Sequence, residues 1–275
     1  MNLQGLISPL GFLGAGNMAA AILKSIVGKG LIAGDACAAV DVIPGKAEAL
    51  AADLGIRACR TAAEVLERSR AVVLATKPQD MKALLSSIQA AVQPHHLIVS
   101  IAAGVPCGAI EAALPPGARV VRVMPNTPAL IGEGAAGVAG GANASADDLR
   151  AVVTLFESVG IAAEVKEGDL DAITALSGSG PAYVFKMMEL LSAAGEEMGL
   201  NAGLARRFSL QTFVGASKLA AASGEDPAEL RRRVTSKGGT TAAALEVMEN
   251  GGLDDLFKRA VKRARERSAE LAKQV

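Results

Sequence analysis

The stretch from Val234 to Thr241, VTSKGGTT, places hydroxyl groups, a lysine and two adjacent glycines directly before an Ala- and Leu-rich helical pattern. Such a stretch can hold an anion, because glycines let the backbone turn so that several N–H groups converge. The following helix adds its unpaired first-turn N–H groups and the positive end of its dipole. The predicted chemistry is binding of a small carboxylate. An ordinary helix start, with Ser236 or Thr240 as N-cap, is the alternative.

A second glycine-rich turn lies near the amino end of the chain. Residues 14–19, GAGNMA, follow an apolar strand pattern and open a helical one, which gives a G-x-G-x-x-A dinucleotide fingerprint. Gly14 permits the tight turn, and Gly16 lets a pyrophosphate approach the backbone. We expect Asn17 and Met18 to contact the same coenzyme at the start of the helix. A glycine-rich turn that binds nothing is the alternative.

Asp41 ends the second predicted strand, where an acidic side chain binds the ribose hydroxyls of an unphosphorylated coenzyme. A 2′-phosphate favours an arginine there, yet Val42 and Ile43 follow, and the first cation in the loop is Lys46. NADPH and NADH therefore both stay open as coenzymes. A turn residue ahead of Pro44 is the alternative role for Asp41.

Three further loops follow predicted strands at their carboxyl ends, where an open parallel sheet binds its ligands. They contain Thr76, Lys77 and Pro78; Ala102, Ala103 and Gly104; and Asn126 between two prolines. We expect the first two loops to line the coenzyme cleft and the third to form a rigid wall beside the nicotinamide. Plain turns are the alternative for each.

Short β-branched runs alternate with helical patterns up to about residue 165, which predicts βαβ units and a parallel sheet. The predicted strands are Leu10–Leu13, Ala38–Val42, Ala71–Thr76, Leu97–Ile101, Arg119–Met124, Ala135–Ala139 and Ile161–Val165. The predicted helices between them are Met18–Val27, Gly45–Leu54, Ala62–Glu67, Gln79–Ala91, Ile110–Ala113 and Ala146–Ser158.

After Val165 the sequence contains only helical patterns. They cover Pro181–Met198, Ala202–Ala222, Pro227–Val234, Thr241–Asn250 and Leu253–Lys273. The predicted architecture is an α/β Rossmann-like doubly wound sheet at residues 1–166, followed by an all-α domain at residues 167–275.

The composition narrows the class of protein. With 28 basic and 28 acidic residues the formal net charge is zero, so charge does not point to nucleic acid or an anionic membrane as partner. The three cysteines, Cys37, Cys59 and Cys107, lack metal-ligand spacing, so neither a metal site nor a disulfide framework is expected. No apolar run reaches the ~20 residues of a membrane span, and we read no signal peptide. A cytoplasmic protein is the expectation.

The sequence offers no obvious histidine for acid–base chemistry. Its two histidines, His95 and His96, are adjacent in a Gln-Pro-His-His loop that we expect at the surface. Serine and cysteine nucleophiles lack a base partner for the same reason. A hydride-transfer enzyme can work without such a base when its substrate is already an activated electrophile, as a cyclic imine is.

The sequence resembles the pyrroline-5-carboxylate reductase family over nearly its whole length. The resemblance rests on the segments Gly11–Ala19, Lys77–Gln79, Val121–Pro128, Ser177–Tyr183 and Val234–Thr241. It implies reduction of 1-pyrroline-5-carboxylate to L-proline by hydride from NAD(P)H, the last step of proline biosynthesis. It also implies a homodimer with interlocking helical domains, an active site between Rossmann and helical domains, and in some members a larger ring of dimers.

The resemblance also implies roles for individual residues. The substrate carboxylate would be held by Ser236, Gly238, Gly239, Thr240 and Thr241. Thr241 would in addition lie beside the imine nitrogen, as hydrogen-bond partner or proton relay. The chain departs from the family after the second strand, where an Asn-Arg or Ser-Arg pair often holds a 2′-phosphate and this chain has Asp41-Val42.

Two other classes of protein share some of these features. β-Hydroxyacid dehydrogenases have the same architecture, and Lys186 invites comparison with their catalytic lysine. That lysine follows a glycine by fewer residues than separate Gly180 and Lys186, and Met187 to Glu189 replace the expected asparagine. A non-catalytic nucleotide sensor would have no need for the carboxylate-binding stretch.

Overall fold

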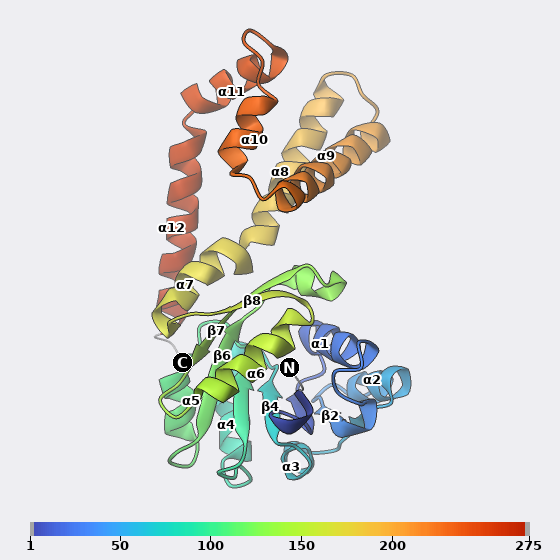
Figure 1. The fold of residues 1–275 in the computed structure, drawn as a ribbon, viewed down its shortest axis with the longest axis vertical. Coiled ribbons are helices and arrows are strands. Elements are labelled where there is room, and N and C mark those ends of the chain that lie inside the picture. The colour runs from blue at the N-terminus through green and yellow to red at the C-terminus, as the bar shows by residue number, and fades with distance from the viewer. Residues whose placement is uncertain (1–2, 273–275) are drawn as a thin grey trace. The chain divides into compact units, whose positions relative to one another are not determined.

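The computed structural model describes residues 3–272. Its first part is an eight-stranded sheet with the strand order β3-β2-β1-β4-β5-β6-β7-β8 (Figure 1). The strands are β1 Leu10–Leu13, β2 Cys37–Val40, β3 Arg57–Ala58, β4 Ala71–Leu74, β5 Leu97–Ser100, β6 Arg119–Met124, β7 Gly134–Gly140 and β8 Gly160–Glu164. Neighbouring strands are parallel except for β6 and β7. The predicted Rossmann-like, doubly wound sheet is confirmed.

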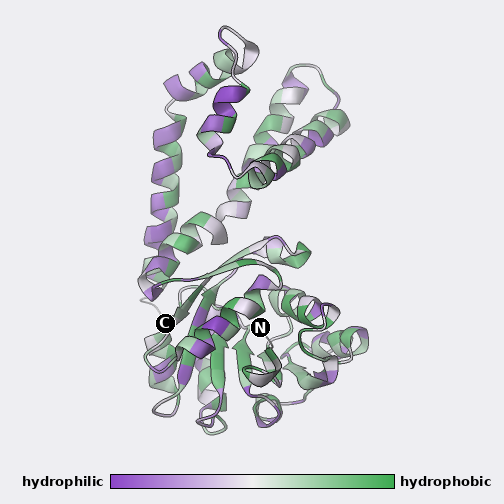
Figure 2. Ribbon diagram, in the orientation of Figure 1, coloured by the Kyte–Doolittle hydropathy of each residue, from purple (hydrophilic) through white to green (hydrophobic). Residues whose placement is uncertain are grey.

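Helices cover both faces of this sheet (Figure 1). They are α1 Asn17–Gly28, α2 Lys46–Leu54, α3 Ala62–Glu67, α4 Met81–Ile88, α5 Cys107–Ala113 and α6 Ala146–Glu157. Alternate strand residues enter two separate cores: Phe12 and Val73 pack with α1, α2 and α6, whereas Leu13 and Val72 pack with α3, α4 and α5. Both faces are therefore buried, which is why the strands read as continuous apolar runs and are mostly green in Figure 2.

The rest of the chain is helical. The helices are α8 Gly180–Glu197, α9 Ala202–Ser223, α10 Pro227–Arg233, α11 Thr240–Asn250 and α12 Leu253–Ala272. Within residues 3–272 no strand follows Glu164, as predicted. None of the helices described there combines the length and the apolar character needed to cross a bilayer.

The chain divides into two compact units at a different point from the predicted boundary at residue 166. One unit comprises the chain up to Ser179 together with Ala264 onward, and the other comprises Gly180–Arg263. Residues 167–178 form η5 Glu167–Asp169, α7 Leu170–Ile173 and the π-helical turn η6 Thr174–Gly178. Leu170 and Ile173 fill the space that a Cβ on Gly137 of β7 would need, so this segment packs on the sheet. The predicted boundary corresponds to the end of the last strand. Residues 167–178, which follow it, still pack on the sheet and therefore belong to the same unit.

Three local predictions need correction. β6 and β7 are antiparallel, because the connection between them contains only the short η4 turn Thr127–Ile131 and no crossover helix. The predicted helix over 79–91 is a 3-10 turn, η3 Pro78–Asp80, followed by the shorter α4. Strand β3 was not predicted, since its two residues are too few to form a pattern.

His96 is buried rather than at the surface, whereas His95 is exposed as predicted. Its Nδ1 accepts a hydrogen bond of 2.8 Å from the Gln93 N–H. Its Nε2 lies 3.1 Å from the Leu66 carbonyl of α3, to which it donates in the matching tautomer. Burial lowers the pKa of His96, and the neighbouring His95 lowers it further.

This environment predicts a pH-dependent stability. Folded His96 stays neutral where an unfolded histidine takes up a proton, near pH 6.5. Its contribution to stability is therefore present above that pH and lost as the pH falls below it. We expect the melting temperature between about pH 7 and pH 5 to fall more steeply for wild type than for His96→Gln. His95→Gln removes only the weaker of the two causes that lower this pKa and should keep most of the wild-type slope. Equal slopes for wild type and His96→Gln would contradict the assignment.

Candidate active site

A cavity of about 540 Å³ opens at the carboxyl ends of β1, β2 and β4. The predicted coenzyme residues that line it are Gly14, Gly16, Asp41, Thr76 and Lys77. Loops that are far apart in the sequence meet there because the doubly wound order places β1 between β2 and β4. This is the edge of the sheet at which Rossmann folds bind dinucleotides.

Gly14 and Gly16 of the fingerprint are glycines for different structural reasons. Gly14 has a φ of +110°, and a Cβ there would lie 2.6 Å from the Ala75 carbonyl oxygen, so only glycine fits the turn. Gly16 is the N-cap of α1, and a Cβ on it would meet nothing within 4 Å. Because α1 has no side-chain cap, its first N–H groups lack a side-chain acceptor, which suits a pyrophosphate.

Asp41 connects the loops that follow β1 and β2. Its Oδ2 accepts a hydrogen bond of 2.7 Å from the Ala15 N–H, and its Oδ1 accepts one of 2.8 Å from the Ile43 N–H. The second of these is the turn role that we gave as the alternative. The first fixes the fingerprint loop itself, so Asp41 is a structural anchor of the cavity. Each carboxylate oxygen keeps acceptor capacity for a ribose hydroxyl, which stays a prediction.

Thr76 supplies an independent sign that a ligand belongs in this cavity. Its hydroxyl Oγ1 is buried and has no hydrogen-bond partner among the described residues. A buried hydroxyl without a partner is costly and needs an explanation. Together with the open space at Gly16, it fits a polar coenzyme in the cavity.

Other predicted coenzyme residues do not line this cavity. They are Asn17, Met18, Pro78, Ala102, Ala103, Gly104 and Asn126. Asn17 and Met18 lie within the fingerprint, in the first turn of α1. A Cβ on Gly104 would lie 3.5 Å from the Cβ of Leu271 in α12. The coenzyme roles of these residues stay predictions.

Asn126 has structural partners on both sides of its amide group. Its Nδ2 donates a hydrogen bond of 3.0 Å to the Ser177 carbonyl, and its Oδ1 accepts one of 2.8 Å from the Ala135 N–H. The side chain thereby ties the η4 turn to β7 and to η6. These hydrogen bonds fix the loop around Asn126, which we predicted to be rigid because of its flanking prolines.

Several residues that line the cavity were not predicted from the sequence. Val42 is 97% exposed and Ile43 is 51% exposed, which leaves apolar surface at its rim. Arg60 and Thr61 reach it from the loop between β3 and α3. The available signal was the Thr61-x-x-Glu64 capping pattern, in which Thr61 Oγ1 accepts from the Glu64 N–H at 3.2 Å.

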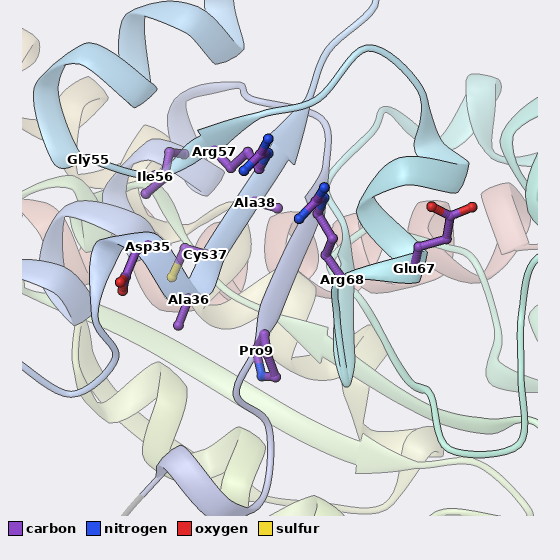
Figure 3. Close-up of a pocket in the computed structure, with 10 residues that line it drawn as sticks. All are labelled: Pro9, Asp35, Ala36, Cys37, Ala38, Gly55, Ile56, Arg57, Glu67 and Arg68. Atoms are coloured by element: carbon purple, nitrogen blue, oxygen red, sulfur yellow. The ribbon is translucent and has the colours of Figure 1, made fainter.

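A second cavity of similar size, about 550 Å³, lies at the opposite edge of the sheet (Figure 3). It is lined by the amino ends of β2 and β3 and includes Asp35, Cys37, Arg57, Glu67 and Arg68. None of the predicted site residues lines it. The volume of a cavity therefore does not identify the coenzyme site. The first cavity is the candidate because it lies at the carboxyl ends of the strands.

The cysteines are buried free thiols with no sign of nucleophilic chemistry. Burial, and then the negative charge of Asp35, raises the pKa of Cys37 to about 12. Burial, and then Glu167, raises the pKa of Cys107 to about 12. Neither thiol is ionised near neutral pH. Among the residues described, no group of three or more His, Cys, Asp or Glu side chains is placed to hold a metal ion.

The stretch before α11 has the geometry of an anion-binding turn. Gly238 has a φ of +70°, and the Gly239 N–H donates a hydrogen bond of 3.0 Å to the Ser236 carbonyl. Gly239, not Ser236 or Thr240, is the N-cap of α11, so the ordinary capped start that we gave as the alternative is wrong. The first turn of α11 contains no acidic residue and has no side-chain cap. Its N–H groups are left for an acceptor from outside the helix.

The side chains around this turn are arranged for access. Ser236 and Thr240 are exposed, and Thr241 is half-buried. A Cβ on Gly239 would collide with the Ser236 hydroxyl oxygen, so glycine keeps that hydroxyl in place.

Lys186 has an ordinary explanation. Its Nζ lies 2.5 Å from Oε1 of Glu189, one turn further along α8, and both side chains are exposed. Such i,i+3 pairs are common on helix surfaces. The comparison with the catalytic lysine of β-hydroxyacid dehydrogenases gains no support from this pair.

Two family profiles match the chain. Residues 9–104 match the family described as NADP oxidoreductase coenzyme F420-dependent. Residues 167–271 match the family described as pyrroline-5-carboxylate reductase dimerisation.

Individual relatives cover almost the entire chain. The pyrroline-5-carboxylate reductase of Pseudomonas aeruginosa is 43% identical over 97% of this chain and 97% of its own length. Pyrroline-5-carboxylate reductase 3 of Mus musculus is 37% identical over 96% of both chains. These identities extend over both compact units.

Solved structures of reductases share the fold. The pyrroline-5-carboxylate reductase of Coxiella burnetii has a TM-score of 0.90 at 32% identity and covers 96% of this chain and 98% of its own. The pyrroline carboxylate reductase of Plasmodium falciparum, solved with NADP bound, has a TM-score of 0.84 at 31% identity, covering 96% and 97%. The chain belongs to the pyrroline-5-carboxylate reductase family, the NAD(P)H-dependent oxidoreductases of the last step of proline biosynthesis.

Proposed function

We propose that this chain reduces 1-pyrroline-5-carboxylate to L-proline and binds the substrate carboxylate at residues 236–241. When bound, NADPH supplies the hydride for the imine carbon. The observation that supports the carboxylate site is the uncapped start of α11 after Gly238 and Gly239. The direct test is the loss of NADPH absorbance when purified protein is mixed with 1-pyrroline-5-carboxylate.

Carboxylate binding would rest on backbone and hydroxyl donors. The first N–H groups of α11 and the Ser236 and Thr240 hydroxyls supply hydrogen bonds, and the helix dipole favours a negative charge there. Lys237 is exposed in the same turn and adds a positive charge. Apart from Lys237, the carboxylate is then held by uncharged donors.

Thr241 is the residue that we propose next to the reacting imine. It belongs to the first turn of α11 and is half-buried, so a ring bound by its carboxylate lies within reach of its hydroxyl. The hydroxyl would donate to the ring nitrogen or pass it a proton. Neither histidine competes for this role, because His96 is bonded to Gln93 and Leu66 and His95 is in an exposed loop. Most of the rate acceleration would then come from orientation of the two reactants.

The coenzyme would occupy the cavity at the carboxyl ends of β1, β2 and β4. We propose that the pyrophosphate lies at Gly14, Gly16 and the first turn of α1, with Thr76 Oγ1 as a further donor. The remaining predicted contacts are Asn17, Met18, Asp41, Lys77, Pro78, Ala102, Ala103, Gly104 and Asn126.

We infer the assembly and the compartment from the family and from the cysteines. The match to the dimerisation family supports a homo-oligomer, and we propose a homodimer that can assemble into a ring of dimers. The buried free thiols of Cys37, Cys59 and Cys107 support a reducing, cytoplasmic location.

The coenzyme assignment predicts the effect of Gly16→Asp. A Cβ at this position meets no protein atom within 4 Å, and Asp is a favoured N-cap residue, so the variant should fold without loss of stability. Its carboxylate would repel the pyrophosphate and weaken NADPH binding at least ~10-fold, measured by coenzyme fluorescence. Gly28→Asp, at the other end of α1 and equally free of contacts, is the control and should bind normally. Normal NADPH binding by Gly16→Asp would refute the assignment.

The proposed role of Thr241 predicts a difference between two substitutions. Thr241→Val keeps the shape but removes the hydroxyl, and it should lower kcat roughly 10-fold to 100-fold with little change in the coenzyme Kd. Thr241→Ser keeps the hydroxyl and should retain most of the activity. If both variants turn over equally fast, the hydroxyl has no part in the reaction.

The carboxylate site predicts the effect of Gly239→Ala. The new methyl group would displace the Ser236 hydroxyl, so KM for 1-pyrroline-5-carboxylate should rise about 10-fold while the NADPH Kd stays constant. Gly108→Ala in α5 is the control, because a Cβ there meets nothing within 4 Å. An unchanged KM would argue against carboxylate binding at this turn.

A further inference from the structure

We propose that Arg60 and Lys46 bind the 2′-phosphate of NADPH and that Arg60 is the main determinant of coenzyme selectivity. This inference rests on the proposed coenzyme cavity. The two cations would explain how a chain with Asp41-Val42 after β2 can accommodate a phosphorylated ribose.

The position of the ribose follows from the fingerprint. With the pyrophosphate at the start of α1, the adenosine ribose lies at the carboxyl end of β2, beside Asp41. Lys46 and Arg60 line the same cavity as Asp41, one from the start of α2 and one from the loop before α3. Two cations from different loops therefore border the ribose end of the cavity.

Local structure fixes the backbone of Arg60 and leaves its side chain available. The Cys59 N–H donates to the Ala39 carbonyl at 2.8 Å, which extends the pairing of β3 with β2 up to this loop. The Arg60 N–H donates a hydrogen bond of 2.9 Å to Glu64 Oε2. The Glu64 carboxylate therefore binds the backbone of Arg60. In the described part of the chain, neither the Arg60 guanidinium nor the Lys46 ammonium forms a salt bridge. Both charges are exposed and free to meet a phosphate.

The charges around the cavity favour an additional phosphate. Among the residues that line the cavity are three cations, Lys46, Arg60 and Lys77, and two carboxylates, Asp41 and Asp80. Asp41 is moreover engaged on both oxygens by the N–H groups of Ala15 and Ile43. These two backbone donors partly offset its negative charge, which reduces the repulsion of a 2′-phosphate. Arginine is well suited to the opposite task, because its planar guanidinium binds phosphate with two parallel hydrogen bonds.

The test compares two fragments of the coenzyme that differ only in the phosphate position. Binding of 2′,5′-ADP and of 5′-ADP to the full-length protein is measured by calorimetry, for wild type, Arg60→Gln and Lys46→Gln. We expect Arg60→Gln to weaken 2′,5′-ADP binding roughly 10-fold to 100-fold, and Lys46→Gln to weaken it less. Binding of 5′-ADP should change little in both variants. The ratio of kcat/KM for NADPH to that for NADH should fall in parallel, with unchanged melting temperatures.

A matched control is available in the second cavity. Arg57 and Arg68 are exposed arginines at the amino ends of the strands (Figure 3). Arg57→Gln lies only a few residues from Arg60 in the sequence and should leave the binding of both fragments unchanged.

The other outcomes overturn the proposal in distinguishable ways. Equal loss of both fragments in Arg60→Gln would mean that Arg60 stacks on the adenine or supports the loop. Unchanged binding of both would remove Arg60 from the coenzyme site. If wild-type protein bound neither fragment while Gly16→Asp still abolished NADPH binding, the selectivity proposal would fail but the coenzyme cavity would stand. If Gly16→Asp bound NADPH normally, the cavity assignment itself would fail.

Discussion

The backbone N–H groups at the starts of α1 and α11 are the constraint on which the proposed chemistry depends. Every helix begins with donors that have no partner inside the helix, and these must find an acceptor. Other helices of this chain satisfy them with their own side chains: Thr61 caps α3, Ser145 and Asp148 form a capping box on α6, and Asn201 and Asp226 cap α9 and α10. Helices α1, α2 and α11 begin instead after a glycine without a side-chain cap. Of these, α1 follows the dinucleotide fingerprint in the sheet unit, and α11 follows Gly238 and Gly239 in the helical unit. These two starts suit one anionic coenzyme and one anionic substrate.

The sheet determines which loops can cooperate around the first of these helices. Because β1 lies between β2 and β4, the turns that follow these three strands share one edge. The bonds from Asp41 to Ala15 and Ile43 then hold the first two turns at a fixed distance. The coenzyme cavity is thus a consequence of strand order, and its precision comes from one carboxylate.

Local patterns in the sequence predicted the parts of this structure that local physics decides. The short apolar runs of the strands, their alternation with helical patterns and the spacing of Gly14 and Gly16 predicted the sheet and the position of the fingerprint turn correctly. Features that depend on distant partners were missed. His96 is buried, and its Nε2 lies within hydrogen-bond distance of the Leu66 carbonyl of α3. Residues 167–178 belong to the sheet unit because Gly137 leaves room for Ile173. No sequence pattern near either position indicates these contacts.

Coenzyme selectivity illustrates the same limit in electrostatic terms. The sequence motif for coenzyme selectivity considers only one position, the residue after β2. The binding of a phosphate, in contrast, depends on every charge within several ångströms. Asp41 is unfavourable for a 2′-phosphate at that position, yet its carboxylate holds the fingerprint loop through Ala15, so replacing it would disturb the pyrophosphate site as well. A chain that keeps this anchor and uses NADPH must bring its cations from elsewhere. The loop before α3 is the adjacent element that can do so, because pairing of β3 with β2 places Arg60 at the same edge of the sheet.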